Sequence, residues 1–368
     1  MSDIKVNNIQ SLEGTHGPVV SGIATMSSVG AMTLPRGDTA YRGGRGRGIW
    51  GGGVISGNRD LMQYVTIATK GDALDFGNLT LGMRALGGAA SSTRGLWAGG
   101  LNSITIEYAT ISSTGNAFDF GDLSAETFYP AGAADNTRAL FAGGYDAGSP
   151  AFFYKKIEYV TIASLGNASE FGFLYNGTQG ATGSIGGVDD INKGGKTDMG
   201  SCSSPTRAIF AGGNEGYNYP TTSISMNSID YVTIQTLGNA SDFGDLLDGR
   251  TGICGVSNST RGVFGGGHNG PNITLTSTST TNVIQYITIA SLGDAIDFGE
   301  LTKDRERFQG VSSQTRGVFG GGNATPASNS EIIDFVTIAT LGNATDFGDL
   351  IEGAREQGAC SDSHGGLG

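Results

Sequence analysis

The sequence has few of the side chains that hold metals or build disulfide frameworks. It contains three cysteines and three histidines in 368 residues. Cys202, Cys254 and Cys360 are widely spaced, odd in number and outside any C-x-x-C pattern, so we expect buried, reduced thiols. No histidine stands at a metal-ligand spacing from another, and we therefore expect no bound metal and no cofactor.

The chain also lacks an excess of positive charge and any long hydrophobic run. Its formal net charge is -12, from 34 acidic and 22 basic residues. An acidic chain has no general attraction for phosphates, which argues against nucleic acid and anionic lipid as partners. The first residues contain no apolar signal-peptide core, and no stretch approaches about 18 apolar residues, so we expect neither secretion nor membrane insertion.

Glycine, by contrast, is abundant, with 64 residues, or about 17% against a usual value of about 7%. The glycines show no three-residue period and instead punctuate a sixfold repeat. Its first part is an apolar double-glycine strand opened by an arginine, at Arg47, Arg94, Arg138, Arg207, Arg261 and Arg316. Its second is an alternating strand opened by an aromatic, at Tyr64, Tyr108, Tyr159, Tyr231, Tyr286 and Phe335. Its third is an acid-aromatic-glycine run with the acids Asp75, Asp119, Glu170, Asp242, Asp297 and Asp346.

Each repeat supplies four strand-like segments when the run before the arginine is counted. Residues 250–257 and 307–312 are examples of this first segment. The segments are short, separated by turn residues and without the 3.6-residue period of helices. Four strands per repeat, at repeat lengths typical of propellers, predict an all-β protein with a six-bladed β-propeller.

The first repeat is incomplete, because residues 41–46 are too short and too rich in glycine to form its innermost strand. A segment that aligns with the missing strand follows the sixth repeat, at residues 355–362. We therefore predict that residues 47–368 form the propeller and that the C-terminal strand completes blade one. Such closure removes two sheet edges that would otherwise be open to aggregation.

Alternating strand directions place two kinds of connection on opposite faces of a propeller. On one face, which we call the uniform face, the turns are short and alike, as at residues 237–240 and 257–260, and we expect both ends of the domain there. On the other, the variable face, the loops differ between blades, and such loops commonly carry recognition. The candidate binding residues in these loops are Tyr145, Phe152, Phe153, Tyr154, Tyr175, Asn214, Tyr217, Tyr219, His268 and Asn269. Packing against the disc is the alternative role for each of them.

The repeated arginines and acids both fall on the uniform face. A residue that occurs six times cannot mark a unique catalytic centre, so we interpret these side chains as structural pairs or as partners of the backbone. We expect no enzymatic activity. Within the insertion at residues 175–195, Asp189 and Asp190 leave two interpretations open, an oxygen-ligand calcium site or a solvated acidic loop.

The order of features resembles the kelch family. In that family an arginine precedes the inner strand, a Gly-Gly pair ends the second, a tyrosine marks the third and an aromatic marks the outer strand. Arg250, Gly265, Gly266, Tyr286 and Phe298 stand in those places in the fifth repeat. Because phenylalanine replaces the family's outer-strand tryptophan in every repeat, the resemblance implies a kelch-like propeller rather than a member of the core family.

Residues 1–46 contain no repeat element and are too short for a core of their own, so we interpret them as an extended N-terminal attachment arm. Together with the phrase at residues 335–350, the arm resembles virion structural and tail-fibre-like proteins of tailed phages that infect marine bacteria and cyanobacteria. The resemblance implies a virion protein assembled in the host cytoplasm, homo-oligomeric or in several copies. Its arm would contact other virion proteins, and its variable face would contact host-surface glycan or protein.

Two other functions stay open. A decoration or connector protein of the capsid, neck or baseplate would use the same fold without touching the host. A hydrolase that degrades the host surface is the third possibility, although the sequence supplies no unique set of catalytic residues for it.

Overall fold

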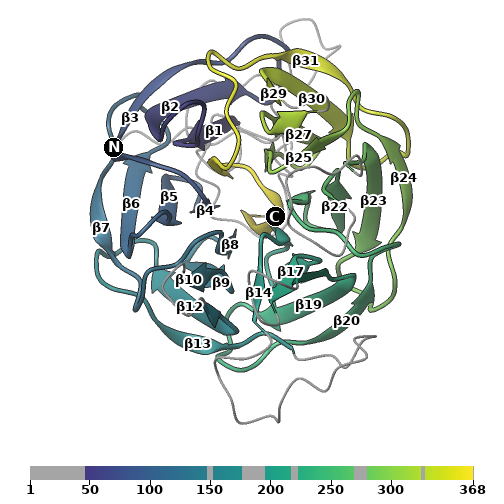
Figure 1. Ribbon diagram of the computed structural model, residues 1–368, viewed down its shortest axis with the longest axis horizontal. Coiled ribbons are helices and arrows are strands. Elements are labelled where there is room, and N and C mark those ends of the chain that lie inside the picture. The colour runs from purple at the N-terminus through teal and green to yellow at the C-terminus, as the bar shows by residue number, and fades with distance from the viewer. Residues whose placement is uncertain are drawn as a thin grey trace, which may run out of the picture. The chain divides into compact units, whose positions relative to one another are not determined.

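The computed structural model describes residues 46–146, 152–175, 195–216, 223–268, 280–324 and 328–367. All of them belong to the unit Gly37–Gly368. They form six antiparallel four-stranded sheets, arranged as blades around a central axis (Figure 1). The predicted six-bladed, all-β propeller is confirmed.

Five blades run along the chain from the inner to the outer strand. Blade two contains β4 (Leu86–Ala90), β5 (Arg94–Gly99), β6 (Thr105–Thr110) and β7 (Phe118–Asp122). Blade three contains β8 (Ala131–Ala134), β9 (Arg138–Ala142), β12 (Lys156–Thr161) and β13 (Ser169–Phe173). Blade four contains β15 (Gly200–Ser203), β16 (Arg207–Ala211), β19 (Ser228–Thr233) and β20 (Ser241–Asp245). Blade five contains β21 (Cys254–Ser257), β22 (Arg261–Gly265), β23 (Val283–Thr288) and β24 (Ile296–Glu300), and blade six contains β26 (Gln309–Ser312), β27 (Arg316–Gly320), β30 (Ile332–Thr337) and β31 (Thr345–Asp349).

Blade one joins the two ends of the domain. Its outer three strands are β1 (Arg47–Gly51), β2 (Arg59–Thr66) and β3 (Leu74–Met83), and its inner strand is β32 (Gly358–Ser361) from the C-terminal end. β32 pairs antiparallel with β1 over four residues. The Asp362 carboxylate also accepts the Arg47 backbone N–H at 2.9 Å. The predicted closure by the C-terminal strand is confirmed.

The inner strands begin later than the sequence pattern predicts. Residues 250–257 yield a strand only from Cys254, and residues 355–362 only from Gly358. The reason is a backbone turn, since Gly252 and Glu356 have φ angles of 64°. A left-handed residue cannot continue a β-strand, so the chain enters each blade through a bend.

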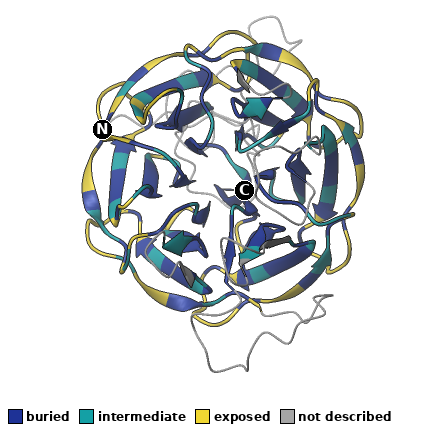
Figure 2. Ribbon diagram, viewed as in Figure 1, coloured by how far each residue is buried: buried dark blue, intermediate teal, exposed yellow. Residues whose placement is uncertain are grey.

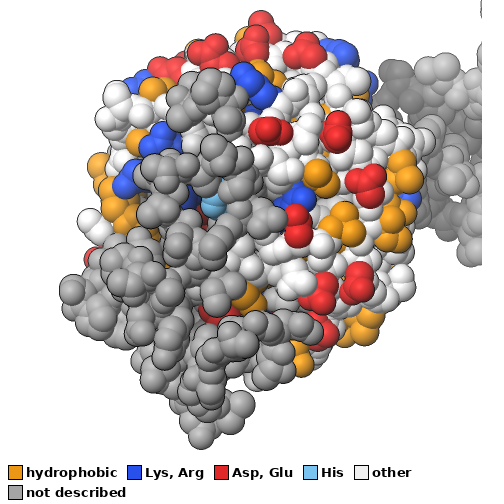
Figure 3. Space-filling model, turned by 45° about the vertical axis from the view of Figure 1, so that its right-hand side comes forward, with side chains coloured by type: hydrophobic (Ala, Val, Ile, Leu, Met, Phe, Trp, Pro, Cys, Tyr) orange, Lys and Arg blue, Asp and Glu red, His pale blue; other side chains and the backbone are white. Residues whose placement is uncertain are grey.

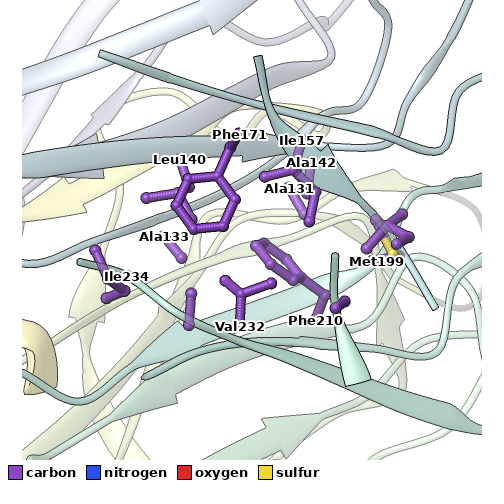
Figure 4. Close-up of a cluster of buried hydrophobic side chains, with 13 residues drawn as sticks. Ala131, Ala133, Leu140, Ala142, Ile157, Phe171, Met199, Phe210, Val232 and Ile234 are labelled. Atoms are coloured by element: carbon purple, nitrogen blue, oxygen red, sulfur yellow. The ribbon is translucent and has the colours of Figure 1, made fainter. Parts of the chain in front are cut away.

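The hydrophobic core consists of six clusters, one at each boundary between neighbouring blades. Between blades three and four, Leu140 and Phe171 pack against Phe210 and Val232 (Figure 4). Between blades six and one, Phe347 packs in the same cluster as Trp50. Figure 2 shows that burial is concentrated inside the ring and exposure at its turns and rim. Because apolar side chains fill all six boundaries, each blade packs against a neighbour on both sides.

The outer strands are joined to the next blade through the Gly-Asn or Gly-Asp turn. The Gly115 N–H donates to the Phe76 carbonyl at 2.7 Å, and the Asn116 side chain accepts the Asn78 N–H at 3.1 Å. Gly77, from the acid-aromatic-glycine run, has a φ of 140°, and a Cβ there would lie 2.4 Å from the Gly115 carbonyl oxygen. Glycine is therefore required where one blade's outer strand meets the next blade's turn.

The repeated arginines form a backbone-hydrogen-bonding set. The Arg47 guanidinium stacks 4.6 Å from the Tyr64 ring centroid in its own blade and donates to the Ile111 carbonyl of the next blade at 2.9 Å. The same two contacts recur at Arg94, Arg138, Arg207, Arg261 and Arg316. Within the described ranges no ion pair joins these arginines to the repeated acids. Asp75 instead accepts the backbone N–H of Gly77 at 2.9 Å.

A second repeated contact was not anticipated from the sequence. The third strand of each blade carries a buried acceptor just before its aromatic residue, at Gln63, Glu107, Glu158, Asp230, Gln285 and Asp334. Each accepts a backbone N–H from the preceding blade, from within β3 in the case of Glu107 and from the second residue after the outer strand in the other five. The sequence signal was a polar residue directly before the aromatic residue of the third strand and directly after an apolar one. This polar residue is acidic in four blades and glutamine in two.

Glu107 is buried, and no ion pair to it occurs among the residues that the structure describes. Burial raises its pKa above the ordinary value. A raised folded-state pKa means that the carboxyl group supports folding below its unfolded pKa and loses that contribution as pH rises through the folded pKa. We expect Glu107→Gln to gain stability relative to the wild type as pH rises from about 4 to about 8. Urea unfolding at several pH values measures this, and a pH-independent difference would contradict it.

The three cysteines are buried and unpaired, as predicted. Burial raises the pKa of Cys202 to about 12 and also raises the pKa of Cys254 and Cys360. Because the thiolate is the reactive form, we expect native protein to react with Ellman's reagent at least about 100-fold more slowly than unfolded protein. Three thiols should then be counted in denaturant. Fast labelling of the folded protein would show that an inner strand opens.

Candidate functional site

On the variable face, the loop after the double-glycine strand forms short strands in several blades, and in blades four and six these strands pair with the connection into the blade. In blade three, β10 (Tyr145–Asp146) pairs with β11 (Phe152–Phe153). In blade four, β14 (Lys196–Thr197), β17 (Asn214–Gly216) and β18 (Ser223–Ser225) form a small sheet. In blade six, β25 (Arg305–Glu306), β28 (Asn323–Ala324) and β29 (Ser328–Asn329) form another. These additions differ in size, so this face is irregular where the opposite face is uniform.

Several predicted binding residues pack within the fold. Phe153, Asn214 and His268 are buried. His268 also bridges Thr251 and Thr280 through its backbone. Their side chains are therefore placed to support the loops rather than to meet an external molecule directly.

Tyr145 is half-buried and lies within a stack of aromatic rings. Its centroid is 5.1 Å from that of Phe128, 6.2 Å from that of Tyr129 and 5.6 Å from that of Phe153. Stacked rings cover one another's faces, so this set contributes packing between the loop and the entry to blade three.

Besides Tyr145, two predicted residues retain exposed surface. Tyr175 is 41% exposed, and its backbone N–H donates to the buried Asp230 carboxylate at 3.1 Å, which anchors the start of the insertion. Tyr154 is half-buried, with the Lys156 ammonium 4.7 Å from its ring centroid. Burial raises the pKa of Tyr154. Phe152 is placed only as a residue of β11, whereas Tyr217, Tyr219, Asn269, Asp189 and Asp190 lie outside the described residues.

A ring of left-handed residues surrounds the axis at the variable face, one at the entry to each inner strand. They are Ala85, Tyr129, Asp198, Gly252, Arg307 and Glu356, with φ angles between 51° and 64°. Backbone hydrogen bonds connect neighbours in this ring, for example Glu356 N–H to Arg307 oxygen at 3.0 Å and Arg307 N–H to Gly252 oxygen at 2.8 Å. Non-glycine residues pay about 1–2 kcal/mol each for this conformation. The ring had no signature in the sequence because its residue types differ in every blade.

The side chains of this ring meet at the axis. Arg307 donates to the Asp198 carboxylate at 3.0 Å and lies 3.7 Å from the Glu356 carboxylate. The Arg307 guanidinium is also 5.4 Å from the Tyr129 ring centroid. Burial raises the pKa of both Tyr129 and Asp198. This cluster occupies the variable-face end of the axis.

The C-terminal tail occupies the opposite end. After β32 the chain forms a short 3₁₀ turn, η1 (Gly365–Leu367), near the centre of the ring (Figure 1). His364 Nε2 lies 2.8 Å from the Ala90 carbonyl oxygen, and its Nδ1 accepts the Gly366 N–H at 3.1 Å. Between the two ends, the inner strands line two small cavities of about 60 Å³ each. Such volumes hold a few water molecules.

The comparisons with known proteins give no family. No protein-family model matches the chain, and a search of the curated proteins finds no significant match. The functional interpretation therefore depends on the chain's own residues.

Two further features are absent from the described ranges. No group of three or more histidine, cysteine, aspartate or glutamate side chains there is arranged to hold a metal ion. In that same part of the chain, no helix is long and apolar enough to cross a membrane.

Proposed function

We propose that this protein is a non-enzymatic structural component of a tailed-phage virion, with a kelch-like propeller that presents its variable face to glycan or protein on the host surface. The observation that carries the proposal is the contrast between the two faces. One face repeats the same turn and the same backbone contacts in every blade, whereas the other carries a different addition in blades three, four and six. Differences between blades are where specificity can reside.

The exposed chemistry of the variable face suits such a target. Tyr175 offers an aromatic surface beside the insertion, and Tyr154 stands next to Lys156. Aromatic rings with polar neighbours bind both sugars and protein surfaces, because an apolar face and a hydrogen-bonding edge are presented together.

The filled axis supports a non-enzymatic role. Among the residues that the structure describes, the Arg307 cluster stands at one end of the axis and His364 with η1 at the other, and the cavities lined by these residues and by the inner strands are small. The arm at residues 1–46 would fasten the protein to other virion proteins, in several copies or as a homo-oligomer. The virion assignment itself is supported by the resemblance of the repeat phrase and the arm to phage proteins.

The test measures binding of the purified full-length protein to host cells. We expect saturable binding that Tyr175→Ser weakens at least about fivefold, because the substitution removes an exposed aromatic contact. Leu292→Ser is the matched control, since Leu292 is 58% exposed in the turn before β24, on the uniform face. Wild-type protein that is present in particles but does not bind host cells would favour the connector or decoration function. Absence from purified particles would overturn the virion proposal.

A further inference from the structure

Exposed apolar side chains form a regular pattern on the uniform face. Blades three to six each carry a leucine at the tip of the turn that leads into the outer strand. These are Leu165, Leu237, Leu292 and Leu341, and each is between 53% and 58% exposed. Single exposed leucines are common on protein surfaces, but four at one equivalent position are a pattern.

Blades one and two lack this leucine but carry an apolar residue close by. Lys70 and Thr114 occupy their turn tips, whereas Leu74 and Phe118 begin their outer strands at 59% and 64% exposure. Blade five has both kinds, since Ile296 at the same strand position is 57% exposed. The corresponding residues of the other three blades are polar, namely Ser169, Ser241 and Thr345. Every blade therefore contributes at least one large apolar side chain, and we call these seven residues the apolar ring.

The apolar ring adjoins the stacked arginines and aromatics of the repeat. Phe118 lies 5.9 Å from Tyr108, on which Arg94 stacks at 4.9 Å. The turn tip also reaches the preceding blade, because Lys70 of blade one lies 4.9 Å from the ring centroid of Phe335 in blade six. The tip leucines occupy the position of Lys70 in their own blades. We therefore expect each to lie beside the half-exposed tyrosine that occupies the position of Phe335 in the preceding blade. Tyrosine and arginine are the residue types that most often dominate the energy of protein interfaces.

Apart from Lys70, the exposed charge beside the apolar ring is acidic, because the six repeated arginines of the same face are half-buried and donate to backbone carbonyls. The six repeated acids are all exposed, and each directly follows the strand position of Leu74, Phe118 and Ile296 in its own blade. Figure 3 shows acidic and apolar side chains interspersed along the rim of the ring that comes forward in that view. Two copies placed face to face would bring two such sets of acids together, which opposes self-association in a chain of charge -12. A surface that complements this face is apolar and bordered by Lys and Arg.

We infer that the uniform face is a docking surface for a second protein, which presents apolar side chains within a basic border. At each boundary between blades, the first outer-strand residue of one blade is followed by the turn tip of the next blade. At least one of these two residues is apolar at five boundaries, whereas both are polar between blades six and one, where they are Thr345 and Lys70. This polar boundary defines one orientation of the partner around the axis. The inference goes beyond the proposed function, because it gives the repeated scaffold a contact of its own.

Site-specific photo-cross-linking tests the inference with the full-length chain, expressed from its gene in its native setting. The cross-linker replaces Leu237 on the uniform face or Leu247 on the variable face, two leucines of blade four that are both 53% exposed. We expect the cross-linker at position 237 to capture one protein at least tenfold more than the cross-linker at position 247 does. The cross-linked site on that protein should contain Lys or Arg beside apolar residues. No excess at position 237, or capture of a second copy of this chain, would overturn the inference.

A pair of double variants separates docking from folding. Leu237→Ser with Leu341→Ser removes two tip leucines, and Leu247→Ser with Ile351→Ser changes two exposed residues of the same blades on the opposite face. We expect only the first variant to lose the partner, by at least tenfold in the amount recovered, while both melt at the same temperature. Equal recovery of the partner would overturn the inference.

The outcomes distinguish docking from the proposed function. A cross-link at position 237 to a partner with Lys and Arg around its apolar contact, in a chain that is itself absent from purified particles, would support the docking surface and overturn the virion assignment. Particles that contain the protein but give no cross-link at position 237 would overturn the docking surface and leave the virion assignment standing.

Discussion

A chain that ends at Gly353 should lose its cooperative thermal transition at the temperature where the full chain melts. The truncation removes β32, its ladder with β1 and the buried side chains of Ala359, Cys360 and Leu367. It also leaves β1 of blade one without a partner on its inner side. Loss of these hydrogen bonds and buried side chains costs more than about 5 kcal/mol, which is comparable with the whole stability of many domains.

Tryptophan fluorescence is a direct measure of this closure. Trp97 of blade two donates its indole N–H to the Gly358 carbonyl of the closing strand at 3.1 Å, and Trp50 of blade one donates to Gln309 at 2.9 Å. Both indoles are fully buried, so opening should shift their emission to longer wavelength. Addition of a synthetic peptide of residues 354–368 is the control and should restore the native spectrum. An unchanged melting temperature in the truncated chain would show that the ring closes without its last strand.

Asp334→Ala should be the most destabilising single substitution of a charged residue. Asp334 and Arg305 are both fully buried, and their side chains are 2.6 Å apart. The substitution would leave a buried guanidinium without its counter-charge, and breaking such a pair costs about 3–5 kcal/mol. Arg305 would remain held by the Gly321 and Ile332 carbonyls, so the charge could not easily reach water.

Urea denaturation measures this cost, with Asp346→Ala as the matched control. Asp346 is an exposed acid of the same blade, and its loss should change stability by less than about 0.5 kcal/mol. Combining Asp334→Asn with Arg305→Met should recover much of the loss, because a neutral pair needs no compensation of charge. A loss below about 1 kcal/mol for Asp334→Ala would mean that water reaches Arg305.

The repeat made the architecture predictable from the sequence. Turn glycines, alternating strands and the apolar double-glycine strand are local patterns, and each has a direct backbone consequence. The closing strand at residues 355–362 was found by counting strands. The first repeat lacks its inner strand, and one additional strand follows the sixth repeat, so the additional strand can complete only the first blade. Blade number and ring closure followed from this count.

The contacts between blades could not be predicted in the same way. The buried acceptors at Glu107 and Asp334 look like surface residues of an alternating strand until the preceding blade places a backbone N–H against them. The left-handed ring uses a different residue type in each blade, so no pattern identifies it. Tyr145 resembled a binding residue, but its neighbours Phe128 and Phe153 approach only after the loop folds back.

The sequence by itself determined six blades, their strand order and the strand that closes them, because periodic polarity and turn residues act on the chain over a few positions at a time. Only the tertiary structure decided which contacts the blades make with one another. It placed the repeated arginines on carbonyls of the next blade, filled both ends of the axis, and aligned Leu74 and Phe118 with the tip leucines of other blades. These are relations between residues far apart in the chain, set by the rotation that relates one blade to the next.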